Sequence, residues 1–418
     1  MRLLKTTTLL GLLACAPPAI AQEAPVPAAR ASYDQVVTQL RSAAPENRLD
    51  ALRSLGATAY PEAIAQISQL LTDPVDDVQL ETIYTLLSFY HVEKPAIVKR
   101  KKGLIVETRS RSAAQSIYDL GPYGLIPQPV PVELTNGLAQ SMFDQNPRVR
   151  IESVYALGVM ARPPLDGYAA DALPRLLQDT NEDIREATAR VIGGLRVSTA
   201  GDALVQALND KSTRVATAAM RALGDVKAWQ ALTPLTDQFT YHKGKGPRAE
   251  AALDALARIA HASSQPVFVA QLTASSPNLR RLAGEGLARS GNREAAQQAA
   301  TTLAGDKERD VQLAGAFASV MAGPQGGSSG VSSLVQALDN GANHEQAMGY
   351  LVELGARAVP GLDQALASKD PATRESVTLV LGFIGGDEAL VLLERARGDG
   401  DLRVVRAAER AIARLRKG

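Results

Sequence analysis

A tyrosine recurs at equivalent places in three successive segments of the chain, each time after a β-branched apolar residue: Tyr84, Tyr118 and Tyr155. A polar residue precedes each tyrosine by three positions: Glu81, Gln115 and Glu152. Arginine takes the tyrosine's place in the flanking segments: Arg53, Arg190 and Arg221. Tyrosine offers a broad contact area at low rotamer entropy, and arginine binds carboxylates and carbonyl groups. These residue types predict a site that binds a protein or peptide, with ring-to-helix packing as the structural alternative.

A run of positive charge lies between the first two of these tyrosines. Lys99, Arg100, Lys101 and Lys102 are consecutive, within an irregular stretch that covers residues 94–108. Such a basic patch attracts an acidic partner or anionic lipid head groups. A solvated loop is the alternative interpretation.

Residues for catalysis or metal binding are sparse. The four histidines are isolated from one another, and none has a second ligand at the i+4 position: His91, His242, His261 and His344. The single cysteine, Cys15, lies close to the N-terminus, and no nucleophile motif accompanies the serines. We therefore expect no catalytic residues, no bound metal and no cofactor.

The N-terminus has the order of features found in a secretory signal peptide. Arg2 and Lys5 precede an apolar run from residue 9 to 16, and Ala19-Ile20-Ala21 forms a small-x-small cleavage site. Residues 1–21 are predicted to be removed, residues 22–30 to form an extended spacer, and the protein to be periplasmic or secreted. Leu12-Leu13-Ala14-Cys15 resembles a bacterial lipobox, which gives the alternative of an envelope lipoprotein anchored through Cys15. No later run is long enough for a transmembrane segment.

Composition narrows the range of partners. The 418 residues include 45 basic and 44 acidic side chains, so no global field is available to bind nucleic acid. Apolar residues make up 45% and charged residues 21%, which is typical of a globular chain. We expect no nucleic-acid partner.

One pattern recurs along almost the whole mature chain and sets the architecture. An apolar residue, often followed by Arg, precedes an Ala-Leu-Gly type of sequence by nine positions, and successive starts lie 27 to 37 residues apart. The twelve starts are Asn47, Val78, Ser112, Val149, Ile184, Val215, Ala249, Leu279, Val311, Gln346, Thr373 and Val404. Each period accommodates two short helices that must bury their apolar faces on the next pair. Residues 31–418 are therefore predicted to form an all-α solenoid of about twelve two-helix repeats.

Turn and helix-end residues support this division. An Asp precedes the second helix of many units, where its side chain can accept backbone N–H groups: Asp73, Asp144, Asp179, Asp210, Asp306, Asp339 and Asp370. A Gly is predicted to cap the second helix in a left-handed conformation: Gly56, Gly121, Gly158, Gly193, Gly224, Gly355 and Gly382. The stretch 323–330 is rich in Gly and Ser and is predicted to be a mobile loop. For residues 94–108, a β-hairpin and a distorted helix both remain open.

The Asp-turn-Val-Arg and Ala-Leu-Gly features resemble the HEAT family, in particular its short repeats related to those of bilin lyases. The resemblance implies a curved superhelix whose second helices line the concave face. It also implies a ladder in which a helix Arg joins the turn Asp of a neighbouring unit, through Arg48, Arg150, Arg185, Arg280 and Arg374. Gln79, Ala113 and Val405 depart from the Arg pattern, so the ladder is incomplete.

The resemblance leaves two functional hypotheses. The first is an exported bacterial, non-catalytic scaffold or adaptor that binds a protein or peptide on the concave face of its N-terminal half. The second is a lyase or isomerase of the HEAT type, acting on a small molecule in the groove. His344-Glu345 is similar to the metal-binding pairs of deoxyhypusine hydroxylase, but that family repeats the pair, and here it occurs once.

Overall fold

The computed structural model describes residues 33–58, 60–90, 112–121, 130–339 and 341–417. The predicted signal peptide, the spacer, and the irregular stretch 94–108 with Lys99, Arg100, Lys101 and Lys102 lie outside the described residues. The described residues form helices and turns without a strand, which confirms the all-α class.

Within the described residues, eleven helices form one continuous inner row, in which each contacts the next. They are α2 (Pro45–Thr58), α4 (Asp76–Tyr90), α7 (Pro147–Met160), α9 (Glu182–Gly194), α11 (Thr213–Asp225), α13 (Gly246–Ile259), α15 (Pro277–Arg289), α17 (Arg309–Ala322), α19 (His344–Leu354), α21 (Pro371–Ile384) and α23 (Leu402–Lys417). Each contains one of the predicted repeat starts.

Shorter helices form the outer row, many of them preceded or followed by a 3₁₀ turn. They are α1 (Tyr33–Gln39), α3 (Ile64–Ser68), α6 (Val132–Ser141), α8 (Gly167–Ala172), α10 (Gly201–Ala207), α12 (Leu232–Tyr241), α14 (Gln265–Gln271), α16 (Arg293–Leu303), α18 (Pro324–Gln336), α20 (Val359–Ala365) and α22 (Gly386–Ala396). The 3₁₀ turns are η1 (Pro61–Ala63), η2 (Gln69–Thr72), η4 (Leu173–Gln178), η5 (Ser198–Ala200), η6 (Trp229–Ala231), η7 (Ala262–Ser264) and η8 (Gly355–Arg357).

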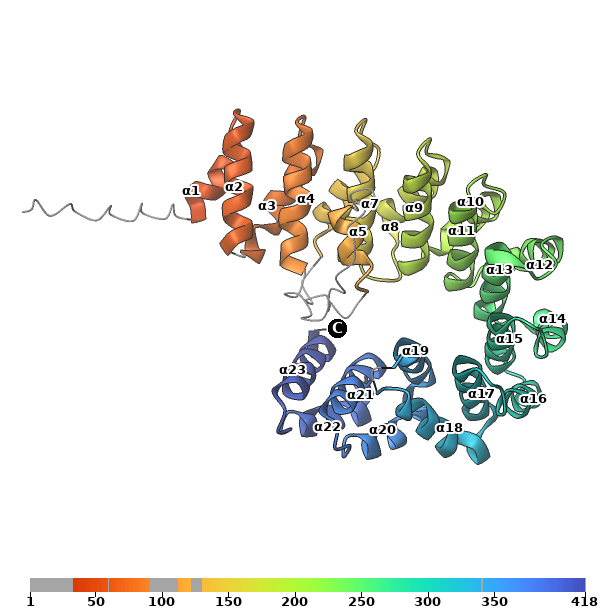
Figure 1. Ribbon diagram of the computed structural model, residues 1–418. Coiled ribbons are helices and arrows are strands. Elements are labelled where there is room, and N and C mark those ends of the chain that lie inside the picture. Colours follow the sequence, from red (N-terminus) through yellow and green to blue (C-terminus); the bar gives the residue numbers. More distant parts are fainter. Residues whose placement is uncertain (1–32, 59, 91–111, 122–129, 340, 418) are drawn as a thin grey trace, which may run out of the picture.

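The two rows together make a strongly curved solenoid. The inner helices line the concave side, and the C-terminal helices come round to face the first half of the array (Figure 1). One apolar core runs between the rows from Val36 to Ile412. Within the described part of the chain, no helix combines the length and apolar character that a membrane crossing needs.

The predicted repeat that starts at Ser112 is wrong as a layer of the solenoid. Helix α5 (Ala113–Tyr118) is only six residues long, and α4 packs directly on α7 beside it. Two hydrogen bonds join α4 to the α6–α7 turn: Gln79 Nε2 donates to Asp144 Oδ2 (3.1 Å), and Asn146 Nδ2 donates to Asp76 Oδ2 (2.7 Å). Helix α5 instead lies on the inner surface of the row. Its Ile-Tyr sequence imitates a second helix, although the helix is too short to stack.

The predicted arginine ladder is present. All five arginines make a two-pronged ion pair with the Asp at the turn of the next unit, as Arg185 does with Asp210 (2.8 and 3.0 Å). The other pairs are Arg48–Asp73, Arg150–Asp179, Arg280–Asp306 and Arg374–Asp399. Each arginine also donates to two carbonyl groups of its own turn, for example those of Asp179 and Thr180. Since these groups are largely shielded from water, the ladder ties adjacent layers more firmly than surface ion pairs do.

The turn aspartates accept backbone N–H groups as predicted, for example that of Ser212 at Asp210 (2.8 Å). The predicted glycine caps are wrong at five of seven positions, because Gly56, Gly158, Gly193, Gly224 and Gly382 lie inside their helices. At these positions the inner helices approach closely. A Cβ on Gly193 would lie 3.0 Å from the Cα of Ala222, and a Cβ on Gly224 would lie 3.0 Å from the Cα of Ala255. Only Gly121 and Gly355 of the seven have positive φ.

The predicted mobile loop 323–330 is also wrong, since residues 324–336 form α18. Pro324 begins this helix, where its missing N–H group costs nothing. Gly330 is required by packing, because an added Cβ would lie 2.6 Å from Val320 Cγ2 of α17.

Candidate functional site on the concave face

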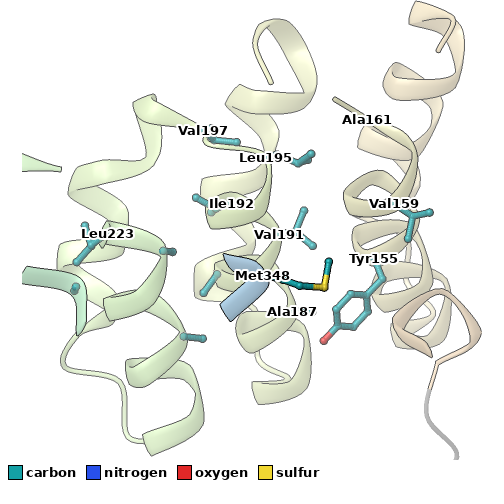
Figure 2. Packing of buried hydrophobic residues seen from close by; sticks show 14 of the residues in the cluster. Tyr155, Val159, Ala161, Ala187, Val191, Ile192, Leu195, Val197, Leu223 and Met348 are labelled. Carbon is teal, nitrogen blue, oxygen red and sulfur yellow. The ribbon is translucent and has the colours of Figure 1, made fainter. Parts of the chain in front are cut away.

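The three predicted tyrosines come together on the inner surface, but they do not form an open column. Tyr155 is only 2% exposed, and Tyr84 and Tyr118 are partly buried. Tyr155, which projects from α7 toward α9 (Figure 2), therefore follows the structural alternative of ring-to-helix packing and is not open to a partner. The helical spacing places this ring on the concave side of α7, and α5 then covers it. Burial raises the pKa of Tyr118 and of Tyr155 to about 12.

Glu152 is the central polar residue of this cluster, and its side chain is fully buried. Its carboxylate accepts from the backbone N–H groups of Ala113 and Ala114 (3.2 and 2.9 Å) and from Ser112 Oγ (3.0 Å). It thus caps the positive end of α5. Glu152 also accepts from Tyr84 OH (3.2 Å) and Arg148 Nε (2.9 Å).

Arg190 holds the other end of α5. Its guanidinium lies 5.3 Å from the ring centre of Tyr118 and 5.6 Å from that of Tyr155, which is cation–π geometry. Its Nη2 also pairs with Asp119 Oδ1 (2.5 Å), and Tyr118 OH donates to the Arg190 carbonyl oxygen (2.9 Å). The predicted neighbourhood of tyrosine and arginine is present, and its contacts are made within the chain.

The remaining predicted residues lie at the edge of this cluster. Arg53 is 58% exposed at its side chain, and its Nε lies 3.6 Å from Glu81 Oε2. Gln115 is partly buried on α5. Arg221 of α11 lies apart from the tyrosines and lines the groove described next.

A charged groove of about 1240 Å³ lies on the concave side between α9, α11, α13, α15 and α19. Gly194 and Gly349 leave backbone exposed in this groove. Six basic side chains line the groove: Arg196, Arg221, Lys227, Arg258, Arg281 and Arg289. The acidic ones are Asp225, Glu250, Asp254, Glu285, Glu345 and Glu353.

Part of this charge is fixed by ion pairs that build the wall between α15 and α19. The buried carboxylate of Glu285 accepts from Arg281 (2.6 Å), Arg289 (3.1 Å) and Tyr350 OH (2.6 Å). Arg289 also binds Glu353 (2.7 Å). Burial alone would raise the pKa of Glu285, but Arg289 and Arg281 outweigh burial and lower it. Helix α19 thereby reaches past α17 to α15.

Two arginines of the groove take no part in such ion pairs. The side chains of Arg196 and Arg221 are exposed, and neither forms a hydrogen bond or ion pair with a described residue. Arg196 has a left-handed backbone (φ 51°), as does Lys227 (φ 57°) at the equivalent place one repeat later. Such a conformation is uncommon for a residue with a side chain. The free guanidinium groups can bind carboxylates or backbone carbonyls.

Asp225 and Lys227 of the groove have pKa values shifted in the directions that favour their uncharged forms. Burial raises the pKa of Asp225 even though Arg258 Nη1 lies 2.7 Å from its Oδ1. Burial, followed by the charge of Arg289, lowers the pKa of Lys227, whose Nζ donates to the carbonyl oxygen of Arg258. The two groups flank the C-terminal end of α11.

Sequence reasoning identified Arg190 and Arg221 but missed the groove itself. Its residues come from five repeats and do not share one repeat position, so no column of identical residue types marks it. The left-handed backbone of Arg196 and Lys227, each two residues after the end of an inner helix, could not be predicted because neither residue type favours that conformation.

Among the described residues, no group of three or more His, Cys, Asp or Glu side chains is arranged to hold a metal ion. His261 Nδ1 lies 2.8 Å from Ser263 Oγ within a turn, which is a local capping contact.

The family model of HEAT repeats matches residues 131–224, 169–250 and 331–413. These matches lie in the part of the chain where two-helix layers follow one another without interruption. No curated protein sequence matches the chain.

Solved structures with a similar arrangement are remote. An engineered protein is 18% identical with a TM-score of 0.38, and the match covers 92% of this chain and 99% of that one. The complex of CpcE and CpcF of phycocyanin lyase from Nostoc sp. PCC7120 is 22% identical with a TM-score of 0.42, over 60% and 96%. Human deoxyhypusine hydroxylase in complex with glycerol is 20% identical with a TM-score of 0.29, over 68% and 96%. We draw no functional argument from likeness at this level.

Proposed function

We propose that this chain, which belongs to the HEAT-repeat proteins, is an exported, non-catalytic adaptor that binds a protein or peptide segment on its concave face. Export rests on the order of charge, apolar run and small-x-small site in residues 1–21. The alternative anchor at Cys15 would place the same concave face at the envelope.

The observation that carries the proposal is the pair of unpaired arginines in the charged groove. Arg196 and Arg221 lie on successive repeats, at the side of a groove whose other three arginines are paired with carboxylates. A chain segment laid along the groove would offer them carboxylates or backbone carbonyls. The expected partner is therefore a segment with acidic side chains. The proposed binding surface is therefore the charged groove and not the three tyrosines predicted from the sequence, because α5 covers Tyr155.

The test is a crosslinking pull-down from an envelope fraction with three forms of the full chain. The wild type is compared with the double variant R196A/R221A and with a control double variant, R41A/R293A, at two exposed arginines outside the groove. Two interface arginines contribute about 2 to 4 kcal/mol together, so the groove variant should lose capture at least tenfold. Equal capture by all three forms would refute the groove as the binding surface.

A lyase or isomerase acting on a groove-bound small molecule is the second candidate. It is favoured by Lys227 and Asp225, because shifted pKa values inside a cavity are a common sign of a reactive site. A purified chain that carries or takes up a chromophore, detected by visible absorption and lost in the variant K227M, would favour this candidate over the adaptor.

A further inference from the structure

Helix α5 has the geometry of a ligand bound to a receptor surface rather than that of a repeat. It makes no layer of the solenoid, since α4 and α7 contact each other beside it. The α4–α7 contact holds through Gln79–Asp144 and Asn146–Asp76, none of which involves α5. The surface beneath α5 is thus formed by helices that are already joined.

Three features of that surface match three features of α5. The buried carboxylate of Glu152 meets the N–H groups of Ala113 and Ala114. A slot bounded by Tyr155, Gly158 and Gly194 receives the ring of Tyr118. The guanidinium of Arg190 lies over that ring and pairs with the acidic residue that follows it, Asp119.

The slot has room for the ring because Gly158 and Gly194 have no side chain. A Cβ on Gly158 would lie 2.8 Å from Tyr118 Cε2, and a Cβ on Gly194 would lie 2.7 Å from Tyr118 OH. These distances are shorter than van der Waals contact, so any side chain at either glycine would displace the ring. Tyr118 OH also donates to the carbonyl oxygen of Arg190 beside the slot.

We propose that the inner surface of α7 and α9 is a peptide-binding site, which α5 occupies as a tethered ligand. The ligand class is a short helix that begins with a Ser N-cap and two small residues and carries a Tyr followed by an acidic residue. A partner segment with these features binds in place of α5. This inference concerns a separate surface and does not depend on the charged groove.

Tethering sets the expected behaviour. A segment attached to its own receptor acts at an effective concentration in the millimolar range, so it excludes a free peptide of equal intrinsic affinity. A free peptide of residues 112–121 should therefore bind poorly to the wild-type chain. It should bind well once α5 is released from the site.

The experiment releases α5 without changing the receptor. Ala114 is fully buried against Glu152, so A114E sets a like charge beside that carboxylate and expels α5. Fluorescence anisotropy of the labelled 112–121 peptide should show binding to the A114E chain at least tenfold tighter than to the wild type. Far-UV circular dichroism should show unchanged helicity.

Two controls make the result specific. The peptide with its own Tyr118→Ala change should bind the A114E chain at least tenfold more weakly, and A114E/G194A should bind the unchanged peptide as weakly, since its slot is closed. Y118A, which removes only the ring, is the second way to release α5 and should also bind the peptide more tightly than the wild type. Equal binding to wild type and variants, or indifference to the peptide's tyrosine or to G194A, would overturn the proposal. So would loss of helicity in both A114E and Y118A, because α5 would then be a structural support.

Discussion

The side-chain amide of Gln79 donates a 3.1 Å hydrogen bond to Asp144, across 65 positions of the chain. It occupies the place in the ladder that Arg takes in five other layers, where the guanidinium reaches both the next Asp and two carbonyls of its own turn. Gln79 is buried, and its Oε1 has no hydrogen-bond partner. The contact shows that the ladder passes from α4 to α7 and that α5 is not a member of it.

Completing the ladder at this position should stabilise the fold. Q79R provides a guanidinium that can reach Asp144 and the two preceding turn carbonyls, and we expect the free energy of unfolding to rise by about 1 kcal/mol. The reverse change, R185Q, should lower it by about 1 to 3 kcal/mol, because it replaces the two-pronged charged contact with Asp210 by at most one neutral hydrogen bond. Urea unfolding followed by circular dichroism measures both. A loss of stability in Q79R similar to that in R185Q would contradict the comparison between the two sites.

The ladder also predicts sensitivity to acid. The hydrogen bonds of Arg185, Arg280 and Arg374 lower the pKa of Asp210, Asp306 and Asp399 respectively. A carboxyl whose folded pKa lies below its unfolded value stabilises the fold above the unfolded pKa, and this contribution is lost as the pH falls through the folded pKa. Stability should therefore be constant near neutral pH and should decrease below about pH 4. Unfolding curves measured between neutral pH and pH 2 test this, and R280M should show a smaller decrease than the wild type.

Much of the architecture could be predicted because the repeat pattern records packing within each unit. Eleven of the twelve starts coincide with inner helices, and the Arg and Asp positions follow from the family resemblance. The failure at Ser112 has a physical reason: a short docked helix uses the same Ile-Tyr and small residues as a stacked one. Burial of Tyr155 could not be predicted from the sequence of α7 alone. It depends on α5, whose Tyr118 ring packs on the ring of Tyr155.

The misassigned glycines give a second test of stability. In α7, G158A adds a Cβ within 2.8 Å of both Tyr118 Cε2 and Val191 Cγ2, so we expect a loss of about 1 to 3 kcal/mol. G349A is the matched control, because Gly349 is an exposed helical residue with nothing within 4 Å of an added Cβ. Alanine there should stabilise α19 by about 0.5 to 1 kcal/mol. Changes of the same sign in thermal unfolding would be inconsistent with a packing role for Gly158.

Burial of Tyr118 and Tyr155, and of Tyr90 at the end of α4, should be visible in alkaline titration. The pKa of Tyr90, of Tyr118 and of Tyr155 is raised to about 12 by burial, from an ordinary value near 10. A raised folded pKa stabilises the fold below the unfolded value, and the contribution is lost as the pH rises from about 10 to about 12. The ultraviolet absorbance of tyrosinate in the folded chain should therefore rise in an early and a late step, and the late step should merge with the early one in denaturant. Y155F should reduce the late step; an unchanged titration would place its ring in solvent.

One buried hydroxyl adds to the ion pairs that hold the wall between α15 and α19. Tyr350 OH donates to Glu285 Oε1 (2.6 Å) and accepts from Gln346 Nε2 (2.9 Å), while its ring stacks on Phe317 at 4.7 Å. Y350F keeps the ring and removes the donor, and Glu285 retains Arg281 and Arg289. A hydrogen bond to a charged group contributes about 1.5 to 3 kcal/mol, so we expect a loss of stability in that range.

Hydrogen exchange locates the effect of Y350F. Because Tyr350 is one of two links from α19 to α15, the other being Glu353 with Arg289, the amides of α19 should exchange faster in Y350F than in the wild type. Those of α7 and α9 should not change. Y33F is the matched control, because it removes a hydroxyl at the other end of the array. Faster exchange spread evenly over the whole chain would show that the hydroxyl supports the fold generally and does not hold α19 in particular.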